Sequence, residues 1–257
     1  MPEDLNVDQR REKILKILNV KGRVRVSELS KLFGISEVTI RHDLAELEEV
    51  NLLYRVHGGA ESTHRAYYTL SLTDRMQRNE QAKRSIAVKA ATLVGEGDTV
   101  ILDSGTTTLM VAQELRQKKG ITVLTNSLLI ARELSASQDA SVILLGGSLD
   151  SANLFVYGDD TYSQLAKYKA DKMFMAVDGI SAKYGITTYL YLEAEVSKRM
   201  GQRANTVIAV ADYSKIGREG FTKIGEVDTI QTLITNKSSP HEELTAIEAK
   251  DIEVITT

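Results

Sequence analysis

The stretch Ser36-Glu37-Val38-Thr39-Ile40-Arg41-His42-Asp43-Leu44 decides the fold of the first part of this chain. Ile40, Leu44 and Leu47 recur at spacings of four and three, which predicts a helix over residues 37–50 with one face turned inward. Ser36 is a favourable N-cap for that helix. A shorter predicted helix, residues 28–33, ends at a glycine just before it. A short helix, a glycine-containing turn and a longer helix together indicate a helix-turn-helix.

The outward face of the longer helix has a composition that suits the major groove of DNA. Arg41 can read a guanine edge or contact a phosphate, and Val38 and Ala45 can contact thymine methyl groups. Ser36 and Thr39, at the start of the helix, suit phosphate or sugar contacts, assisted by the helix N-terminus. This pattern favours DNA as the partner of the module.

Some of these side chains also have a plainer explanation. Arg41 could form only an ion pair with Glu37 or Asp43. His42 and His57 could be ordinary surface histidines. A three-helix unit of this shape can also mediate contacts between proteins.

The residues upstream of the longer helix extend the module. The apolar pattern of residues 14–18 predicts a first helix that ends near Gly22, and residues 24–26 predict a short extended piece. Ser27 is expected to cap the next helix, in which Leu29, Leu32 and Phe33 face inward. Basic side chains concentrate between residues 10 and 25, where Glu12 is the only acidic one. This charge run could also contact DNA.

The residues downstream predict a β-wing, because residues 51–60 alternate apolar and polar and end near two glycines. Arg55 and His57 in the wing would lie near the DNA backbone or the minor groove. The predicted DNA contacts are Ser27, Ser36, Glu37, Val38, Thr39, Arg41, His42, Ala45, Arg55 and His57.

These residues resemble the signature of the DeoR family of bacterial transcription regulators. The resemblance lies in Arg10, Ile14 and Leu18, in the stretch of residues 36–44, and in the wing sequence of residues 54–60. His42 departs from the family pattern, in which arginine or another small or basic residue is commoner. The resemblance implies a winged helix-turn-helix that binds double-stranded operator DNA.

Composition sets limits on the rest of the chain. Its 257 residues suit a small module joined to one larger domain, and 42% hydrophobic with 26% charged residues is typical of a globular protein. The absence of cysteine excludes disulfides and thiolate metal sites. Neither a signal sequence nor an apolar run of about 20 residues is present, so we expect a soluble cytoplasmic protein with no membrane partner. The expected division is residues 1–60, a linker over 61–78, and a second domain over 79–257.

The second domain alternates short apolar segments with helical ones. A helix is expected over residues 79–94, and strands over residues 99–102, 121–124, 141–145, 173–177 and 206–210. Crossover helices fit between the strands, so the pattern predicts an α/β domain with a largely parallel sheet. The whole chain is therefore expected to be a multi-domain α/β protein.

Small polar residues follow several of these strands and could converge on one pocket. Asp103-Ser104-Gly105-Thr106-Thr107-Thr108 places a glycine and hydroxyl groups at a helix N-terminus, a natural anion cradle. The spacing of a P-loop is absent. Ligands of open α/β sheets bind at the carboxyl ends of the strands, although such loops can also be plain turns. The further residues in these loops are Thr125, Asn126, Ser127, Gly146, Gly147, Asp178 and Lys215.

A later helix, residues 192–200, adds charged side chains. Glu195 and Lys198 share a face, as do Glu195 and Arg199. A surface ion pair is one interpretation. In the other, Lys198 offsets phosphate charge in the pocket and Glu195 accepts a sugar hydroxyl.

The DeoR resemblance extends through this domain, in residues 103–108, 125–127, 146–147, 178–179, 195–198 and 212–215. It implies a Rossmann-like sensor domain similar in fold to ribose-5-phosphate isomerase and the coenzyme A transferases, and a phosphorylated sugar as effector. After Gly147 the chain reads Ser148-Leu149-Asp150-Ser151, where many members have a basic residue. An aspartate there would repel an anion if it faced the pocket.

The function that follows is that of a non-enzymatic repressor of a carbohydrate-utilisation operon. We expect a homo-oligomer, dimer or tetramer, because helix-turn-helix modules usually read paired half-sites. No catalytic residue, metal or cofactor is expected. Two alternatives stay open: an isomerase-like enzyme with a DNA-binding appendage, which would need a general base such as Glu195, Asp178 or Asp103, and an activator that senses an unphosphorylated ligand.

Overall fold

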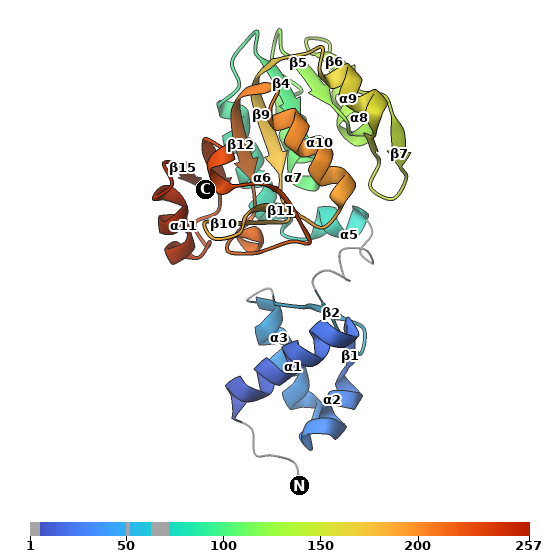
Figure 1. Cartoon of the computed structure of the whole chain (residues 1–257), viewed down its shortest axis with the longest axis vertical. Helices are drawn as coiled ribbons and strands as arrows, with labels where there is room; N and C mark the ends of the chain where they lie inside the picture. The colour runs from blue at the N-terminus through green and yellow to red at the C-terminus, as the bar shows by residue number, and fades with distance from the viewer. Residues whose placement is uncertain (1–5, 50–51, 63–71) are drawn as a thin grey trace. The chain divides into compact units, whose positions relative to one another are not determined.

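The structure is a computed structural model that describes residues 6–49, 52–62 and 72–257 (Figure 1). The chain divides into two compact units, Met1–Ser71 and Leu72–Thr257. Within the described ranges, no helix is both long enough and apolar enough to cross a membrane.

The N-terminal unit is a winged helix-turn-helix. Its helices are α1 (Val7–Lys21), α2 (Val26–Phe33) and α3 (Glu37–Glu49), and its strands β1 (Arg23–Arg25), β2 (Tyr54–Val56) and β3 (Gly59–Glu61) pair antiparallel in the order β1-β3-β2. The predicted apolar stripes meet in one core, with Ile14, Leu18, Ile40 and Leu44 each at most 1% exposed. A Cβ on Gly59 would lie 2.0 Å from the carbonyl oxygen of Val24, so only glycine lets the wing pack on β1.

Two details of the helix-turn-helix prediction are wrong. Helix α2 begins at Val26, and Ser27 lies exposed in its first turn instead of capping it. The reason is that β1 passes directly into α2, because Val26 N donates to Gly58 O and the Val26 side chain is buried. Leu32 is 58% exposed, whereas Leu29 is buried and Phe33 is half-buried against the core.

The predicted linker, residues 61–78, contains regular structure at both ends. Glu61 is the last residue of β3, and helix α5 (Leu72–Gln77) belongs to the C-terminal unit. Residues 63–71 lie outside the described residues, as does the predicted end of the third helix at Val50.

The C-terminal unit is built on a seven-stranded, fully parallel sheet. Its order is β15-β14-β12-β9-β4-β5-β6. The strands are β4 (Thr99–Leu102), β5 (Thr122–Thr125), β6 (Ser141–Leu144), β9 (Ala170–Ala176), β12 (Ala204–Val210), β14 (Thr232–Thr235) and β15 (Glu253–Thr256). The first five are those predicted, and the last two were not.

Helices cover both faces of this sheet (Figure 1). One face packs against α6 (Glu80–Thr92), α7 (Thr106–Leu115) and α8 (Leu128–Leu134), and the other against α9 (Asp159–Leu165), α10 (Tyr191–Gly201) and α11 (His241–Glu248). Strand side chains alternate between the two cores: Phe174 points to the first, and Met173 and Met175 to the second. This is a doubly wound α/β fold.

Smaller elements lie in the connections. Strands β7 (Ser148–Asp150) and β8 (Phe155–Tyr157) form a hairpin, and β10 (Gly179–Ser181), β11 (Gly185–Thr188) and β13 (Thr222–Gly225) form an antiparallel sheet. Two short 3-10 turns, η1 (Tyr213–Lys215) and η2 (Val227–Thr229), complete the unit.

The order of the strands predicts where a ligand binds. The chain runs outward from β4 through β5 to β6, then returns to β9 on the other side of β4 and runs outward through β12, β14 and β15. The direction therefore reverses between β4 and β9. In open α/β sheets, ligands bind outside the carboxyl ends of the strands at this switch point.

Candidate functional sites

The start of helix α3 is organised by its two hydroxyl residues. Thr39 N donates to Ser36 Oγ at 3.1 Å, as expected of an N-cap, and the two side-chain oxygens lie 2.9 Å apart. Val38 is 73% exposed on the outward face. The outward face therefore presents the small and hydroxyl side chains that the sequence predicts for a groove.

The charged residues of α3 are paired within the helix. Arg41 Nη2 donates to Glu37 Oε2 at 2.6 Å, and His42 Nε2 lies 3.7 Å from Glu46 Oε1. Both pairs are solvent-exposed, so each contributes little to stability and can yield to DNA. Arg41 thus has the ion pair of the plainer explanation and is still accessible for DNA.

One residue of the predicted basic stretch has a structural role. Arg10 is 9% exposed, and its Nε and Nη2 donate to Asp43 at 2.6 and 3.1 Å; Arg11 Nε donates to the same carboxylate at 3.2 Å. These contacts fix α1 against α3. Arg10 is therefore enclosed and does not form part of a DNA-contact surface, contrary to the prediction for this stretch.

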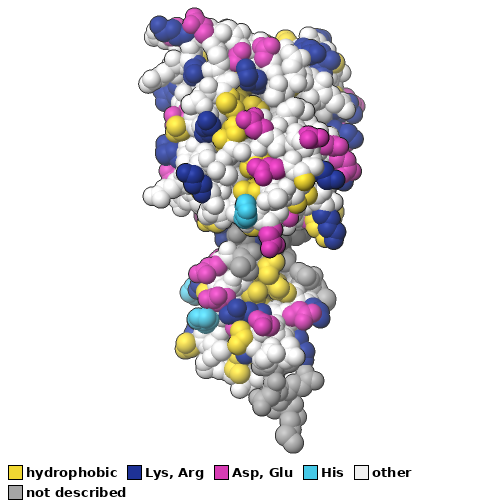
Figure 2. Space-filling model, turned by 90° about the vertical axis from the view of Figure 1, so that its left-hand side faces the viewer, with side chains coloured by type: hydrophobic (Ala, Val, Ile, Leu, Met, Phe, Trp, Pro, Cys, Tyr) yellow, Lys and Arg dark blue, Asp and Glu magenta, His cyan; other side chains and the backbone are white. Residues whose placement is uncertain are grey.

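The remaining predicted contacts are surface residues. Ala45 is half-buried, and Arg55 in β2 and His57 in the wing turn are exposed, with Arg55 N donating to Glu48 Oε1 at 3.0 Å. On the face shown in Figure 2, basic and acidic side chains of the N-terminal unit are intermixed and form no single basic patch. DNA contact on this unit therefore depends on individual side chains.

In the C-terminal unit, a narrow cavity of about 10 Å³ opens at the predicted switch point. Its lining combines the loop after β4 with the start of α7, the β7–β8 hairpin, α5 and α10, through Arg75, Ser104, Gly105, Thr106, Ser127, Asn153, Phe155 and Glu193, together with Leu72, Leu109 and Leu129. This volume is about that of one water molecule, so the cavity must widen to hold a small-molecule ligand.

The anion cradle predicted from the sequence lies in this cavity. Gly105 is the N-cap of α7 and has no side chain to accept the first N–H groups of the helix, which the helix itself cannot satisfy. A Cβ on Gly105 would lie 2.5 Å from the Cβ of Ala176. The glycine thus lets the loop after β4 approach the end of β9 and leaves the helix N-terminus open to an anion.

Other residues of that motif are structural. Thr107 and Thr108 are buried in α7, and Thr108 Oγ1 donates to Gly105 O. Asp103 is fully buried, where it accepts hydrogen bonds from Ser104 N at 2.8 Å and from Ser197 Oγ at 2.7 Å. Burial raises the pKa of Asp103 well above its ordinary value, and the nearby Glu193 adds to this.

Of the loop after β5, only Ser127 reaches the cavity. Thr125 and Asn126 are fully buried, with Thr125 Oγ1 accepting from Ser127 N and Asn126 Nδ2 donating to Val156 O. Ser127 is the N-cap of α8, and its side chain accepts from Ile130 N.

Gly146 and Gly147 turn the chain into the β7–β8 hairpin and do not line the cavity. Gly146 is hydrogen-bonded to α9: its N donates to Gln164 Oε1, and its O accepts from Thr161 Oγ1. Asp150, the predicted source of repulsion, accepts both the backbone N and the side-chain Nδ2 of Asn153. Asp150 therefore stabilises the turn.

Glu195 and Lys198 face away from the cavity. Both are exposed, and Glu195 Oε2 lies 3.4 Å from Arg199 Nε. The spacing rule for the ion pair is confirmed, but the pair is on the solvent face of α10. The helix turns Glu193 inward instead, because Glu193 shares a face with the buried Val196 and Met200.

Glu193 is the acidic residue of the cavity that the sequence reasoning missed. Its Oε1 accepts from Ser104 Oγ at 3.3 Å and its Oε2 lies 2.7 Å from Thr188 Oγ1. The same hydroxyl lies 3.0 Å from Asp178 Oδ2, and Asp178 in turn pairs with Lys215 at 3.0 Å. The predicted Asp178 and Lys215 are thus connected to the cavity through Thr188.

Two cations were also missed. Arg75 of α5 donates to Asn153 Oδ1 of the hairpin, and Lys83 of α6 donates to the carbonyl of Arg75. Burial lowers the pKa of Lys83 to about 8, with Lys215, Arg75 and Arg78 lowering it and Asp212 raising it. Lys83 could have been found from its register with the apolar Ile86 and Ala90, whereas Arg75 fell in the expected linker.

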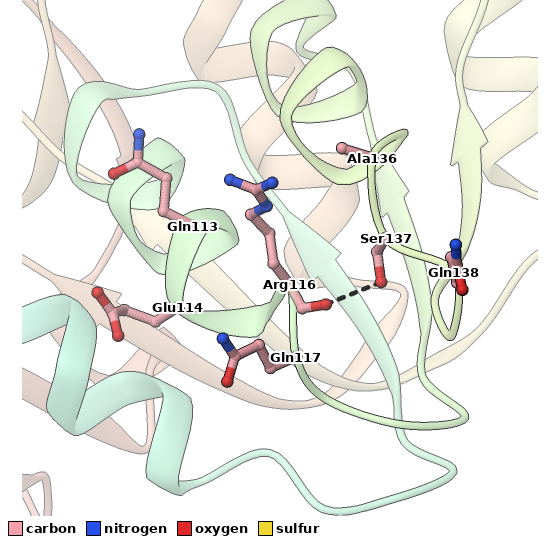
Figure 3. Close-up of a pocket in the computed structure, with 7 residues that line it drawn as sticks. All are labelled: Gln113, Glu114, Arg116, Gln117, Ala136, Ser137 and Gln138. Carbon is pink, nitrogen blue, oxygen red and sulfur yellow. Dashed lines mark hydrogen bonds between the residues drawn. The ribbon is translucent and has the colours of Figure 1, made fainter.

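A second hollow lies between the C-terminal ends of α7 and α8 (Figure 3). Ser137 Oγ donates to Arg116 O across it at 2.9 Å, and the polar side chains of Gln113 and Gln138 are spread around it without converging. These helices start at the carboxyl ends of their strands and run back, so the hollow is at the opposite edge of the sheet from the switch point. Its position is not typical of a ligand site in this fold.

Among the residues that the structure describes, no group of three or more histidine, aspartate or glutamate side chains is arranged to hold a metal ion. The two units instead combine a winged helix-turn-helix with a doubly wound domain that has a cavity at its switch point. This architecture is that of a two-domain DNA-binding transcription regulator.

Comparison with known proteins identifies the family. The DeoR-like helix-turn-helix domain matches residues 10–66, and the DeoR C terminal sensor domain matches residues 78–237. The chain is 35% identical over 250 residues to a putative aga operon transcriptional repressor of Escherichia coli O157:H7, covering 96% of this chain and 93% of the relative. The chain belongs to the DeoR family of transcription regulators.

Other relatives have similar coverage. The lactose phosphotransferase system repressor of Streptococcus mutans is 36% identical over 232 residues, covering 89% of this chain and 92% of the relative. The glycerol-3-phosphate regulon repressor of Escherichia coli K12 is 30% identical, covering 90% and 92%.

Solved structures resemble the fold at a more distant level. Ribose 5-phosphate isomerase A from Methanocaldococcus jannaschii has 17% sequence identity and a TM-score of 0.40, covering 53% of this chain and 54% of that chain. The eIF2B delta structure from Chaetomium thermophilum has 15% identity and a TM-score of 0.41, covering 82% and 65%. Similarity at this level concerns the general fold alone.

Proposed function

We propose that this regulator represses a carbohydrate-utilisation operon and releases its operator when a phosphorylated sugar binds at the switch point. The observation that carries the proposal is the open N-terminus of α7 in the same cavity as Arg75. The relatives support the carbohydrate part, since they are named as repressors of the aga operon, a lactose phosphotransferase system and a glycerol-3-phosphate regulon.

The cavity offers two kinds of chemistry to such a ligand. The first N–H groups of α7 and the Arg75 guanidinium would bind the phosphoryl group, because a helix N-terminus and arginine both favour anions. Lys83 donates to the carbonyl of Arg75, and Lys83 and Lys215 add positive charge near it. Ser104, Ser127 and Asn153 would bind sugar hydroxyls.

Helix α5 offers a route from the cavity to the DNA-binding unit. It begins directly after residues 63–71, which connect the two units in sequence, and its Arg75 contacts both Asn153 and Lys83. A phosphoryl group that binds the Arg75 guanidinium would compete with Asn153 for it, and this change would favour a different position of α5. Effector and operator affinities would then be coupled, and the coupling must be reciprocal.

The protein would act as a homo-oligomer, dimer or tetramer, on paired half-sites and without catalysis. An isomerase with a DNA-binding appendage is the alternative, and it predicts turnover. Incubating the purified chain with pentose and hexose phosphates separates these possibilities, because only the enzyme converts aldose to ketose at ordinary enzymatic rates.

The test of the effector site is a thermal-shift screen with the full-length protein. Pentose, hexose and amino-sugar phosphates are compared with the same sugars lacking phosphate, since a ligand that prefers the native state raises the Tm. We expect one phosphorylated sugar to raise the Tm and to weaken operator binding, and its free sugar to do neither.

Two variants locate the site. Arg75→Ala is expected to abolish the shift, whereas Lys198→Ala, which removes an exposed cation from α10, should keep it. Loss of the response in Lys198→Ala with retention in Arg75→Ala would place the effector elsewhere.

A further inference from the structure

The Thr188 hydroxyl contacts two carboxyl groups at once. Its Oγ1 lies 2.7 Å from Glu193 Oε2 and 3.0 Å from Asp178 Oδ2. A hydroxyl has a single proton to donate but can also accept. One proton can point well at only one of the two oxygens, so the arrangement is satisfied best when Thr188 donates to one carboxylate and accepts from the other acid in its protonated form. The geometry therefore points to one proton shared in this group of residues.

The neighbours of the two acids indicate which one is protonated. Asp178 lies 3.0 Å from Lys215 Nζ and also accepts from Tyr189 N at 3.3 Å, so its negative charge is compensated. The contacts of Glu193 are instead with hydroxyl groups, at 2.7 Å from Thr188 Oγ1 and 3.3 Å from Ser104 Oγ. An ionised acid is stable where a cation compensates it, which places the proton on Glu193.

The wider surroundings of Glu193 favour the same state. The negative charge of Asp178, beyond the end of β9, acts on Glu193, and the positive charge of Arg75 of α5 opposes it. Asp103, beyond the end of β4, is also close to Glu193, and burial raises the pKa of Asp103 as well. Burial raises the pKa of Glu193 to about 7, the charge of Asp178 adds to the rise, and the hydrogen bonds of Thr188 and Ser104 with the charge of Arg75 reduce it. Neutral Glu193 and ionised Glu193 are thus both accessible near pH 7.

Glu193 lines the same cavity as the open N-terminus of α7. A carboxylate beside that N-terminus would repel an incoming anion. It would also compete with the anion for the hydrogen bond of Ser104 and for the positive charge of Arg75. A neutral carboxylic acid does neither. Like charges in an enclosed site interact far more strongly than in water, so the state of this one group affects anion binding directly.

We propose that Glu193 is the proton-carrying residue of the effector site: it is neutral when the anionic effector is bound, and its ionisation weakens that binding. The proposal rests on the proposed function, since it requires the anion site at α7. Binding then takes up one proton from solvent wherever Glu193 is ionised beforehand. The repressor would consequently respond to its effector more strongly at lower pH.

The size of the effect follows from one proton. In the protein without ligand the pKa of Glu193 is about 7. The neutral form, which binds the anion, therefore makes up about nine-tenths of the protein at pH 6 and about one-tenth at pH 8. Affinity for an anion of constant charge should therefore fall about tenfold between these values.

The test uses sulfate, which keeps its double negative charge across this range, whereas a phosphate monoester itself titrates. Sulfate is titrated into the full-length protein at pH 6, 7 and 8, and its Kd is read from the amide signals of Gly105 and Thr106 in NMR spectra. Glu193→Gln imitates the neutral acid, because its amide donates to Thr188 and its oxygen accepts from Ser104. Glu195→Gln, two residues further on the solvent face of α10, is the matched control.

We expect about tenfold weaker sulfate binding at pH 8 than at pH 6 in the wild type and in Glu195→Gln. Glu193→Gln should bind nearly independently of pH, and at pH 8 about tenfold more tightly than the wild type. A merely structural role for Glu193 would weaken binding at every pH.

The outcomes distinguish this proposal from the proposed function. Equal sulfate affinity at all three pH values refutes the proton linkage and leaves the anion site intact. An unchanged pH profile in Glu193→Gln assigns the proton to another group, such as Asp103, and also overturns the proposal. If sulfate does not perturb the amides at the start of α7 at any pH, the anion site itself is wrong, and the proposal fails with it.

Discussion

Replacing Asp43 with alanine should destabilise the DNA-binding unit by about 3–5 kcal/mol. Asp43 has a side chain only 2% exposed and accepts hydrogen bonds from Arg10 at 2.6 and 3.1 Å and from Arg11 at 3.2 Å. The substitution leaves the enclosed Arg10 guanidinium, 11% exposed, without this carboxylate. The cost of a buried unpaired charge is larger than the loss of the contacts themselves.

The matched control is Glu46→Ala on the same helix. Glu46 is 43% exposed and lies 4.0 Å from Arg11 and 3.7 Å from His42, so its loss should cost at most about 1 kcal/mol. Native-state hydrogen exchange of α1 and α3 amides in the full-length protein measures both values, because exchange from global opening reports the free energy of unfolding.

A double variant, Arg10→Met with Asp43→Leu, tests the reasoning further. Apolar residues of similar size should restore most of the stability, because the unpaired charge is gone. The double variant should also bind operator DNA with nearly unchanged affinity, since Arg10 is enclosed. Equal costs for Asp43→Ala and Glu46→Ala, or a large loss of DNA affinity in the refolded double variant, would refute the structural role given to Arg10.

Three further predictions concern single residues. Arg41→Ala should weaken operator binding by about 1–3 kcal/mol in a fluorescence-anisotropy titration, and an unchanged affinity would mean that α3 does not read DNA through this residue. Gly105→Ala should lower the Tm and abolish the effector response, because its Cβ would lie 2.5 Å from the Cβ of Ala176; a variant as stable and responsive as wild type would contradict the packing. The pKa of Glu193 is raised in the folded chain, which therefore keeps this proton between about pH 4.5 and 7, whereas the unfolded chain has lost it. The free energy of unfolding should therefore decrease as the pH rises through this window, by at most about 3 kcal/mol. Urea unfolding against pH should show a steeper slope in wild type than in Glu193→Gln, where the raised pKa of Asp103 still contributes.

The sequence predicts the DNA-binding unit well because its core depends on local periodicity. Ile14, Leu18, Ile40 and Leu44 recur at helical spacings and all lie in the core. The errors arise where a contact distant in sequence decides the outcome. Val26 enters α2 because its N–H bonds to Gly58 of the wing, which no local pattern reveals.

The strands and the switch point could also be predicted in part. The five predicted strands are short apolar runs, and β14 and β15 have the same pattern, so they could have been predicted from it. The loop after β4 was recognised as an anion cradle because Gly105 and its hydroxyl neighbours have that composition before a helix.

The remaining parts of the effector site depend on tertiary packing. The spacing of Glu195 and Arg199 predicts their ion pair equally well on either face of α10, so it cannot say which face turns inward. The buried Val196 and Met200 show which face of α10 turns inward, and Glu193 lies on that face. Arg75 reaches the cavity only because α5 packs beside the hairpin at Asn153, which is 78 residues away in the sequence.

The most direct test of the central claim is the operator affinity of the full-length protein with and without its effector. Operator duplexes are selected from a random pool, and the Kd is measured in the presence of the phosphorylated sugar that raises the Tm most, for wild type and for Arg75→Ala. We expect the sugar phosphate to weaken operator binding of the wild type by 5-fold or more, the range of about 1–3 kcal/mol typical of allosteric coupling, and to leave Arg75→Ala unchanged. Equal operator affinity with and without every phosphorylated sugar, or equal release of wild type and Arg75→Ala, would contradict an effector-gated repressor that senses phosphate at this switch point.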